Sequence, residues 1–269
     1  MRDLLLVDPA FRRRFEELGL DSAAAVLRFL GGDNAVGKNT IIAPATLRFR
    51  DGSVEQVFFK QYIFPTPAWA FIGRHSKARR EYENYAAFRR MDIPCAQALA
   101  CGEQRDGVGR LRRAFILTRA VPDAQTLIEF VQTRCPSRAT LASRKLRLEI
   151  ITQFAPMVGR MHGRNFFHND LVWRNILITC PPQGTPGLWW IDCPRGRFVW
   201  MKRRRLQLKD LAALDKQASR NCSRAERLAF VKAYLGKRRL DAEAKRLARS
   251  VIAYKHQRWS DEAGSTASM

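Results

Sequence analysis

The stretch that decides the fold is HNDLVWRN, residues 168–175. It places a carboxylate, Asp170, five residues before a carboxamide, Asn175, and the apolar run ILI follows at once. A second carboxylate, Asp192, ends another apolar run, LWWI, at residues 188–191. Carboxylate and amide oxygens suit a hard divalent cation, and a carboxylate can accept the proton of an attacking hydroxyl. The pattern predicts a phosphoryl-transfer site in which Asp170 takes the proton while Asn175 and Asp192 hold Mg2+.

The same residues also allow a plainer interpretation, in which Asp170 and Asn175 are an ordinary turn pair. The flanking apolar runs and the second carboxylate after one of them favour the chemical interpretation. His168 is expected to be structural and to bond the loop backbone, not to act as a base.

Composition limits the class of protein and of partner. A chain of 269 residues can form one large domain or two lobes that share a cleft, and 46% hydrophobic residues suffice for a core. The 48 Lys and Arg outnumber the 25 Asp and Glu, which gives a net charge of +23. Such a charge attracts anions, namely nucleic acid, acidic lipid headgroups or a phosphorylated glycan.

No segment reaches the roughly 18 apolar residues that a membrane-spanning helix needs. The first apolar run ends at Asp8 and Pro9 and is too short for a signal peptide, so we expect a cytoplasmic protein. The six cysteines are scattered without a C-x-x-C pair, so we expect reduced thiols and no zinc site.

Strand patterns dominate the first part of the chain and helix patterns the second. The apolar strand 114–118 runs into a loop with Pro122, which suits a hinge between lobes. The order predicts an α+β fold with two lobes. We expect a nucleotide-binding N-terminal lobe of antiparallel strands and one helix, a helical C-terminal lobe that carries the catalytic and acceptor-binding residues, and a disordered tail, at residues 1–119, 120–259 and 260–269.

Residues 31–40, GGDNAVGKNT, nearly match the P-loop pattern G-x-x-x-x-G-K-[ST]. Asn39 stands where the magnesium-binding hydroxyl belongs, and a strand pattern follows instead of a helix. We therefore expect a glycine-bearing turn between strands. Whether it lies over phosphates or is a plain hairpin turn stays open.

Four blocks, two of which include the residues above, point to a family when their order and spacing are taken together. They are FFKQY, SKARREYEN running on to Ile93-Pro94, FHND with Asn175, and WIDCPRGR, which begin at residues 58, 76, 167 and 190. From about Asn39 to Leu235 the chain resembles the lipopolysaccharide core kinases, which phosphorylate Kdo or heptose sugars of the inner core. The resemblance implies a two-lobed fold like that of protein kinases and aminoglycoside phosphotransferases.

The resemblance also implies roles for residues of the first lobe. Lys60 would bind the α- and β-phosphates of ATP, and Glu81 would hold Lys60 through an ion pair. Glu81 is preferred because related phosphotransferases place the acid thirteen residues before a proline such as Pro94. Glu83 remains the alternative.

Further implied roles concern the adenine and the catalytic loop. Thr118, Arg119 and Ala120 would meet the adenine through backbone groups, and Asp210 would brace the catalytic loop from a following helix. Mg2+ would be the cofactor, with ATP as co-substrate.

Departures from the protein-kinase pattern favour another acceptor. Val172 stands where protein kinases have a lysine, and Pro194 stiffens the segment after Asp192. A fixed site for a small or lipid-linked acceptor is the better interpretation. Arg195 and Arg197 are candidates for binding an anionic group of that acceptor. The basic run 202–205 is either a solvated loop or part of the acceptor side.

Three functions are compatible with these features. The first is an ATP-dependent kinase for a heptose or Kdo hydroxyl of lipid-linked core oligosaccharide, working peripherally at the inner face of the inner membrane because its charge favours the anionic membrane surface. The second is a small-molecule phosphotransferase of the aminoglycoside type, which the positive charge opposes. The third is a non-catalytic kinase-like module that binds polyanions. We do not expect nucleic acid as a partner.

Overall fold

The computed structural model describes residues 2–31, 40–135, 140–181 and 184–264. The chain divides into two compact units. Unit 1 comprises Met1–Ala87, Ala96–Pro122 and Asp192–Arg195, and unit 2 comprises Phe88–Cys95, Asp123–Ile191 and Gly196–Met269. The sequence pattern placed the boundary after residue 119, and it did not indicate that two short segments cross between the units.

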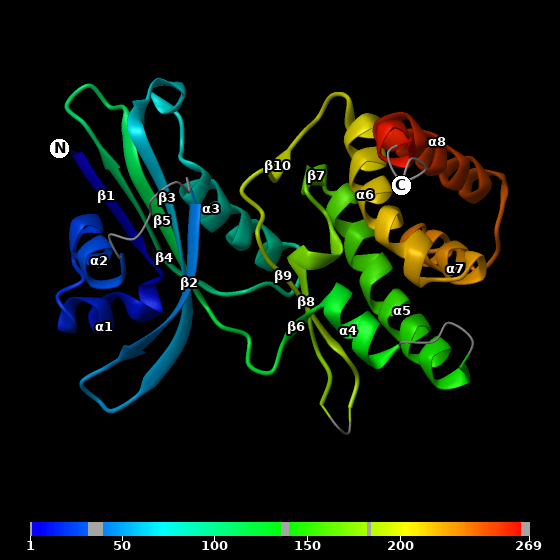
Figure 1. Ribbon diagram of the computed structural model, residues 1–269, viewed down its shortest axis with the longest axis horizontal. Helices are drawn as coiled ribbons and strands as arrows, with labels where there is room; N and C mark the ends of the chain where they lie inside the picture. Colours follow the sequence, from blue (N-terminus) through cyan, green and yellow to red (C-terminus); the bar gives the residue numbers. More distant parts are fainter. Residues whose placement is uncertain (1, 32–39, 136–139, 182–183, 265–269) are drawn as a thin grey trace. The chain divides into compact units, whose positions relative to one another are not determined.

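Unit 1 is built on a five-stranded antiparallel sheet with the order β1-β4-β5-β3-β2 (Figure 1). Its strands are β1 (Arg2–Val7), β2 (Thr40–Arg48), β3 (Val54–Ala68), β4 (Ala98–Arg105) and β5 (Leu111–Arg119). Gly52, with a φ of 80°, turns the chain between β2 and β3. The register pairs Lys60 of β3 with Ile116 of the central strand β5 and with Ile42 of β2. Lys60 therefore lies inside the sheet, not at its edge.

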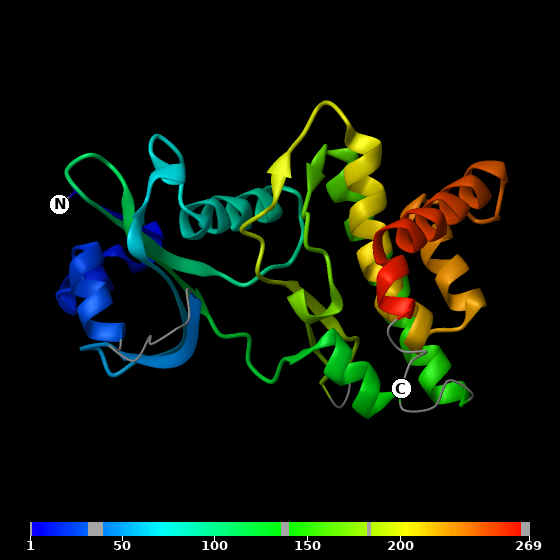
Figure 2. The same cartoon turned by 45° about the horizontal axis from the view of Figure 1, so that its top comes forward.

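Side chains of β3 alternate between the two faces of the sheet, because successive residues of a strand point to opposite sides. Val57 and Phe59 join the apolar core that α1 (Arg12–Glu17) and α2 (Ala23–Leu30) cover. Lys60 and Tyr62 lie on the other face, where α3 (Lys77–Arg90) packs. Figures 1 and 2 show α1 and α2 on one side of the sheet and α3 on the other. Two 3-10 turns, Pro9–Phe11 and Trp69–Phe71, complete the elements of unit 1.

The start of α3 is held by two polar side chains. The Ser76 hydroxyl accepts a hydrogen bond from Arg79 N–H at 3.1 Å, as expected of an N-cap. The Ser76 N–H donates to Glu103 Oε1 of β4 at 2.8 Å. Glu103 in turn accepts two hydrogen bonds from the Arg105 guanidinium. The helix is thereby tied to the sheet at its first turn.

Unit 2 is mainly helical. Its helices are α4 (Leu127–Arg134), α5 (Leu141–Gly163), α6 (Arg203–Asn221), α7 (Arg224–Tyr234) and α8 (Ala242–Gly264). A three-stranded sheet has the order β6-β8-β9, with β6 (Gln125–Thr126), β8 (Ile176–Thr179) and β9 (Gly187–Trp190). A two-stranded sheet pairs β7 (Phe166–Phe167) with β10 (Arg197–Phe198), and a 3-10 turn spans Trp173–Asn175.

Close packing of α5 against α7 depends on a glycine and a buried ion pair. A Cβ atom at Gly159 would lie 2.6 Å from the carbonyl oxygen of Tyr234, so a larger residue there would push α7 away. Arg147 Nε donates to Glu226 Oε1 at 2.9 Å, and these side chains are 2% and 1% exposed. Glu226 also closes the capping box of α7 with Ser223.

Two sequence expectations need correction in unit 2. The run 202–205 is not a solvated loop, because Arg203 to Arg205 form the first turn of α6. The expected tail from residue 260 is helical up to Gly264, after a kink at Trp259, where φ is −127° and ψ is 27°. The Trp259 ring lies 4.9 Å from Lys216 Nζ of α6.

The candidate phosphate loop at 32–39 and the last five residues lie outside the described ranges. None of the helices in the described ranges is both long and apolar enough to cross a membrane.

Candidate active site

Lys60 of β3 and Glu81 of α3 form a buried ion pair in unit 1. Lys60 Nζ donates a hydrogen bond of 3.0 Å to Glu81 Oε2, and the side chains are 11% and 3% exposed. Glu83 lies elsewhere on α3, where it accepts a hydrogen bond from Arg79 Nε and contacts His75 Nδ1. The residue that contacts Lys60 is therefore Glu81 and not Glu83.

The protonation of this pair follows from its surroundings. Burial disfavours the Lys60 ammonium, but interactions with Glu81, Tyr62 and Asp192 outweigh burial and raise the pKa of this group above its ordinary value. Burial raises the pKa of the Glu81 carboxyl, and the Lys60 charge opposes that rise. Lys60 is thus a fixed cation at neutral pH.

Asp192 reaches the same ammonium. Lys60 Nζ donates to Asp192 Oδ1 at 2.6 Å. The φ of Asp192 is 55°, in the left-handed region that non-glycine residues seldom adopt, and such conformations are common at functional sites. Two groups of α3 hold the segment in place: Tyr85 Oη accepts from the Asp192 N–H at 3.1 Å, and Asn84 Nδ2 donates to the Cys193 carbonyl at 2.7 Å.

Two tyrosines complete this cluster, and sequence reasoning missed both. The hydroxyls of Tyr62 and Tyr85 donate to the two oxygens of Glu81, each at 3.2 Å. The available signal was spacing. Tyr62 follows Lys60 by two residues on a strand, and Tyr85 follows Glu81 by four on a helix, so each shares a face with its neighbour.

In unit 2, Asp210 of α6 holds the loop that carries Asp170. Asp210 Oδ2 accepts a hydrogen bond from the His168 backbone N–H at 2.8 Å, and Oδ1 accepts one from the Asn169 N–H at 2.9 Å. The Asp210 side chain is fully buried. Because both oxygens bind successive N–H groups, the loop backbone just before Asp170 is held at two points. Asn169 has a φ of 65°, which asparagine tolerates better than most residues.

Two histidine rings pack next to Asp210 or within the loop itself. His162 Nε2 lies 3.4 Å from Asp210 Oδ2, and His162 Nδ1 lies 2.9 Å from the Tyr234 hydroxyl. Burial raises the pKa of Tyr234 to about 12, so this hydroxyl stays neutral. The His168 ring stacks on Phe88 with 6.1 Å between centroids. His168 thus contributes a backbone donor and packing.

Asn175 is oriented by two hydrogen bonds. Its Nδ2 donates to the Asp170 carbonyl at 2.9 Å, and the Ile191 N–H donates to the Asn175 carbonyl at 3.0 Å. Since the amide nitrogen faces Asp170, the side-chain oxygen is the candidate metal ligand. Ile191 immediately precedes Asp192 in the chain.

The predicted adenine contacts lie at the end of β5. The Arg119 N–H donates to the Gln97 carbonyl at 2.8 Å, and the Ala120 N–H donates to the Gln56 carbonyl at 2.8 Å. Both donors are therefore used within unit 1, which sequence reasoning did not foresee. An adenine bound by these N–H groups would have to replace those bonds, while Thr118 belongs to β5 itself.

The predicted acceptor-binding arginines are both exposed. Arg195 belongs to unit 1, and Arg197 belongs to β10 in unit 2, where it pairs with Phe167 of β7.

The two clusters supply the groups that phosphoryl transfer needs. Lys60 carries a positive charge, which suits phosphate oxygens, and Asp170 is a half-buried carboxylate, a group that can accept a proton. In the described part of the chain, no three His, Cys, Asp or Glu side chains gather into a group that could hold a metal. Magnesium commonly uses one or two carboxylates together with phosphate and water oxygens, and the oxygen donors of Asn175 and Asp192 fit that use.

Unit 2 also contains an apolar cavity of about 90 Å³ among its helices. Its lining is mainly apolar and includes Ile150 and Phe154 of α5 and Phe230 of α7. Arg227 and Asp215 also line it and form an ion pair with two hydrogen bonds, at 2.6 and 2.8 Å.

Known proteins resemble this chain in sequence and in fold. Residues 60–234 match the model of the family described as "Lipopolysaccharide kinase (Kdo/WaaP) family", a range that includes every residue of both clusters. A solved structure described as "WaaP in complex with acyl carrier protein" is similar, with a TM-score of 0.70 and 22% identity over 97% of this chain and 99% of that chain. No curated protein sequence matches the chain significantly. The mixed fold, with its sheet-rich first part, is therefore protein-kinase-like, as the sequence predicted.

Proposed function

Since this chain belongs to the lipopolysaccharide kinase (Kdo/WaaP) family, we propose that it transfers the γ-phosphoryl group of ATP to a heptose or Kdo hydroxyl of the lipopolysaccharide inner core. Family membership makes the chain a phosphotransferase acting on a sugar hydroxyl; ATP and the choice of sugar are proposed. The observation that carries the proposal is the buried Lys60–Glu81 pair with Asp192 on the same ammonium. A buried cation held between carboxylates is suited to anionic phosphate oxygens.

In the proposed reaction, Lys60 binds the α- and β-phosphates of ATP while Glu81 fixes the lysine side chain. An ammonium has three donors. One donor stays on Glu81, and phosphate oxygens compete with Asp192 for the others. The Tyr62 and Tyr85 hydroxyls stabilise the negative charge of Glu81 throughout.

Asp170 accepts the proton of the sugar hydroxyl while the oxygen of that hydroxyl attacks the γ-phosphorus. The new oxygen–phosphorus bond forms while the bond to the β-phosphate oxygen breaks, and ADP leaves. Because Asp210 holds the preceding backbone through His168 and Asn169, the proton acceptor is positioned before the sugar arrives.

Asn175 and Asp192 would hold a magnesium ion, which supplies charge neutralisation at the phosphates when bound. The orientation of the Asn175 amide supports this assignment. We further assign the adenine to the backbone at Thr118, Arg119 and Ala120, and anionic groups of the acceptor to Arg195 and Arg197.

The test uses purified protein, ATP with a labelled γ-phosphate, magnesium and a panel of dephosphorylated inner-core glycans. We expect label on one sugar, and glycans that contain Kdo alone or Kdo with heptose distinguish the two acceptors. The Asp170→Asn variant is the control and should leave every glycan unlabelled. ATP hydrolysis without transfer of the labelled phosphate to any core glycan would contradict the proposal.

Two other functions have their own discriminating results. An aminoglycoside-type enzyme would bind polycations, which the net charge of +23 opposes; drug protection in cells that express the protein would favour it. A non-catalytic module would bind polyanions with a steep salt dependence but neither nucleotide nor magnesium. The buried Lys60–Glu81 pair favours a phosphotransferase over the non-catalytic module, and the net charge favours an anionic acceptor over an aminoglycoside.

We also propose that the enzyme works in the cytoplasm, peripherally at the inner face of the inner membrane. The proposed acceptor is lipid-linked, and a net charge of +23 attracts anionic headgroups.

A protein partner is a second proposal. The similar structure contains WaaP bound to acyl carrier protein, and we propose that this chain also binds an acyl carrier protein. The apolar cavity of unit 2 supports this, because it suits the end of an acyl chain. Acylated carrier should bind more tightly than the unacylated form, and Phe230→Asp should remove that difference. Equal binding of both forms to the wild type would contradict the role of the cavity.

A further inference from the structure

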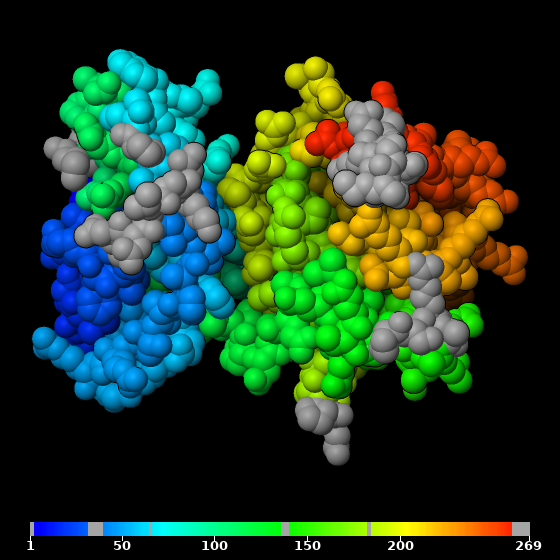
Figure 3. All heavy atoms as spheres, viewed as in Figure 1, coloured from blue at the N-terminus to red at the C-terminus, as the bar shows by residue number. Residues whose placement is uncertain are grey.

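The segment Arg197–Arg205, here called the docking loop, runs from β10 through a connecting loop into the first turn of α6. It places exposed apolar side chains beside a run of cations. Phe198, Trp200 and Met201 are 49%, 74% and 79% exposed. The side chains from Lys202 to Arg205 are exposed too. Residues 196–209 include six Lys and Arg, Lys209 among them, and no Asp or Glu. The loop is the yellow segment at the upper edge of unit 2 in Figures 1 and 3.

Hydrogen bonds at both ends hold the tip of this loop. The Val199 N–H donates to the Asn165 carbonyl at 2.8 Å, and the Arg203 guanidinium donates to Asn165 Oδ1 at 2.8 Å. The Phe198 ring packs edge-on against Phe166 with 5.1 Å between centroids. Because both ends are anchored, the exposure of the tip belongs to a defined structure.

The start of α6 breaks the usual rules for helix ends. Lys202, its N-cap, has a φ of 56° and forms no capping hydrogen bond through its side chain. The first turn holds three arginines and no acid, although the helix dipole favours negative charge there. Local rules are broken most often where function requires it, and an anionic ligand would offset both costs.

We propose that the docking loop is a membrane anchor. Trp200 and Met201 insert into the headgroup region of an anionic bilayer, while Lys202, Arg204 and Arg205 bind lipid phosphates. Tryptophan favours the membrane interface, and each cation near an anionic surface strengthens binding by about fivefold. The inference rests on the proposed function, because a lipid-linked acceptor brings the enzyme to a bilayer.

Other occupants match the loop less well. An acidic soluble protein would account for the cations, but it gives no reason for an exposed tryptophan next to an exposed methionine. A second copy of the chain would bring two like-charged loops together, which costs free energy.

Vesicle sedimentation tests the proposal. Vesicles of equal parts phosphatidylglycerol and phosphatidylcholine should bind the wild type, and Trp200→Ser with Met201→Ser should weaken binding at least about tenfold. Arg204→Gln with Arg205→Gln should weaken it by about 25-fold, and phosphatidylcholine alone should bind poorly. Circular dichroism and a melting curve confirm that each variant is folded.

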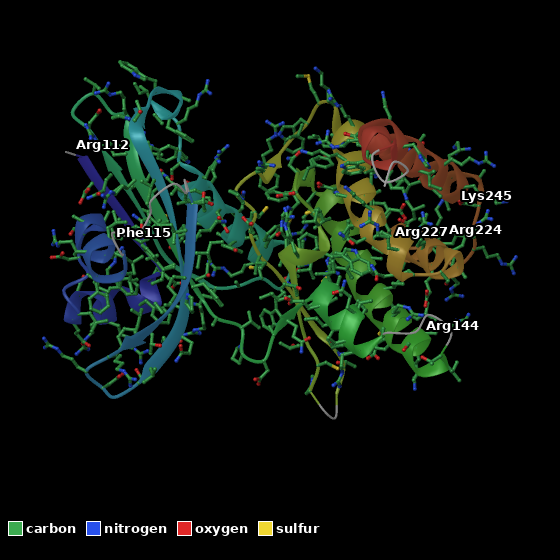
Figure 4. The ribbon with its side chains drawn as sticks, viewed as in Figure 1. Arg112, Phe115, Arg144, Arg224, Arg227 and Lys245 are labelled. Carbon is green, nitrogen blue, oxygen red and sulfur yellow. The ribbon has the colours of Figure 1, made fainter. Side chains whose placement is uncertain are left out.

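The matched control is Arg224→Gln with Lys245→Gln. These exposed cations come from the starts of α7 and α8 and lie toward another end of unit 2 (Figure 4). The control should bind within about threefold of the wild type. Equal losses in both charge variants would show that net charge alone binds the bilayer, and would overturn the proposal.

Two further measurements distinguish insertion of Trp200 from surface attraction and from self-association. Brominated lipids should quench part of the tryptophan fluorescence, and that part should be missing in Trp200→Phe. Unchanged quenching in this variant, or a changed oligomeric state in Trp200→Ser with Met201→Ser, would contradict insertion.

The same serine variant should phosphorylate detergent-dispersed acceptor at the wild-type rate and vesicle-embedded acceptor more slowly. If the wild type binds vesicles through the docking loop but transfers no label to any glycan, the kinase proposal is wrong, whereas the membrane-anchor proposal is supported. Equal vesicle binding by the wild type and the serine variant would contradict the membrane-anchor proposal and leave the kinase proposal unaffected.

Discussion

The Tyr85 hydroxyl joins two groups that the proposed reaction needs. It donates to Glu81 Oε1 and accepts from the Asp192 N–H, so one side chain of α3 links the lysine-holding acid to the candidate metal ligand. Burial raises the pKa of Tyr85 well above its ordinary value, so the hydroxyl stays neutral and can serve both bonds. Asp192 needs such support because its φ lies in the left-handed region.

Replacing Tyr85 by phenylalanine should slow phosphoryl transfer by about tenfold, because the Asp192 N–H loses its partner and the candidate metal ligand is less well positioned. The loss should appear in kcat and in the magnesium concentration for half-maximal rate, with little change in the KM for the glycan. Steady-state kinetics at several magnesium concentrations measure this.

Tyr62→Phe is the matched control, because Tyr62 also donates to Glu81, whereas the Asp192 N–H donates to Tyr85. It should leave the magnesium dependence unchanged. A magnesium shift of the same size in both variants would show that Tyr85 has no particular role at Asp192.

Among the site residues, the sequence indicated the charged groups, with Glu81 and Asp210 as supports, but not the two tyrosines that bind Glu81. Lys60 and Glu81 were predicted because a lysine within a strand and an acid on the next helix follow the family's spacing. Tyr62 and Tyr85 were missed because tyrosines on such faces usually serve only as core. The bonds of Arg119 and Ala120 depend on where neighbouring strands end, which is not a local property.

Among the elements, α3 has the most direct effect on the site, because it carries Glu81 and Tyr85. Its first turn is tied to β4 by the hydrogen bond from the Ser76 N–H to Glu103. Burial acts to raise the pKa of Glu103, but hydrogen bonds from Ser76 and Arg105 outweigh burial and lower this pKa below its ordinary value of 4.5. The ionised carboxylate therefore stabilises the folded protein.

Glu103→Gln should lower the free energy of unfolding by about 2 kcal/mol at neutral pH. A depressed folded-state pKa gives stability that is complete above the unfolded pKa, near 4.5, and is lost as the pH falls through the folded value. The difference between wild type and variant should therefore shrink below about pH 4.5. Urea unfolding at several pH values measures it, and a constant difference would contradict the role of the ionised carboxylate.

Most helices and strands were predictable, because their apolar periodicity and caps are local. The start of α6 was not, since residues 203–205 are polar and have no capping side chain; only contacts such as that of Arg203 with Asn165 reveal the helical turn. The sequence pattern did not predict the strand β1 and showed only a short apolar run there, because its partner β4 lies almost a hundred residues away in the sequence.

The whole molecule carries a net charge of +23, and both units contribute to it. Charge of this size acts over about a Debye length, roughly 8 Å in physiological salt, so it affects encounter with a surface more than chemistry at a buried pair. The Lys60–Glu81 pair, being buried, is screened far less.

Raising the salt concentration from about 0.05 M to 0.3 M should therefore raise the apparent KM for vesicle-embedded acceptor several-fold. The KM for detergent-dispersed acceptor in a neutral detergent should change less, and kcat should change little in both cases. Parallel titrations with sodium chloride measure this, and identical salt effects on both acceptor forms would rule out attraction to the membrane as the cause.

In the proposed reaction, Lys60 of unit 1 and Asp170 of unit 2 serve the same phosphoryl transfer. A direct test compares label transfer from ATP to inner-core glycan by the wild type, Lys60→Met and Asp170→Asn, all shown to be folded. We predict that each variant loses at least about 10³ in rate, or about 4 kcal/mol, with Asp170→Asn still binding ATP. Transfer by Asp170→Asn at more than about a tenth of the wild-type rate would contradict this role of Asp170.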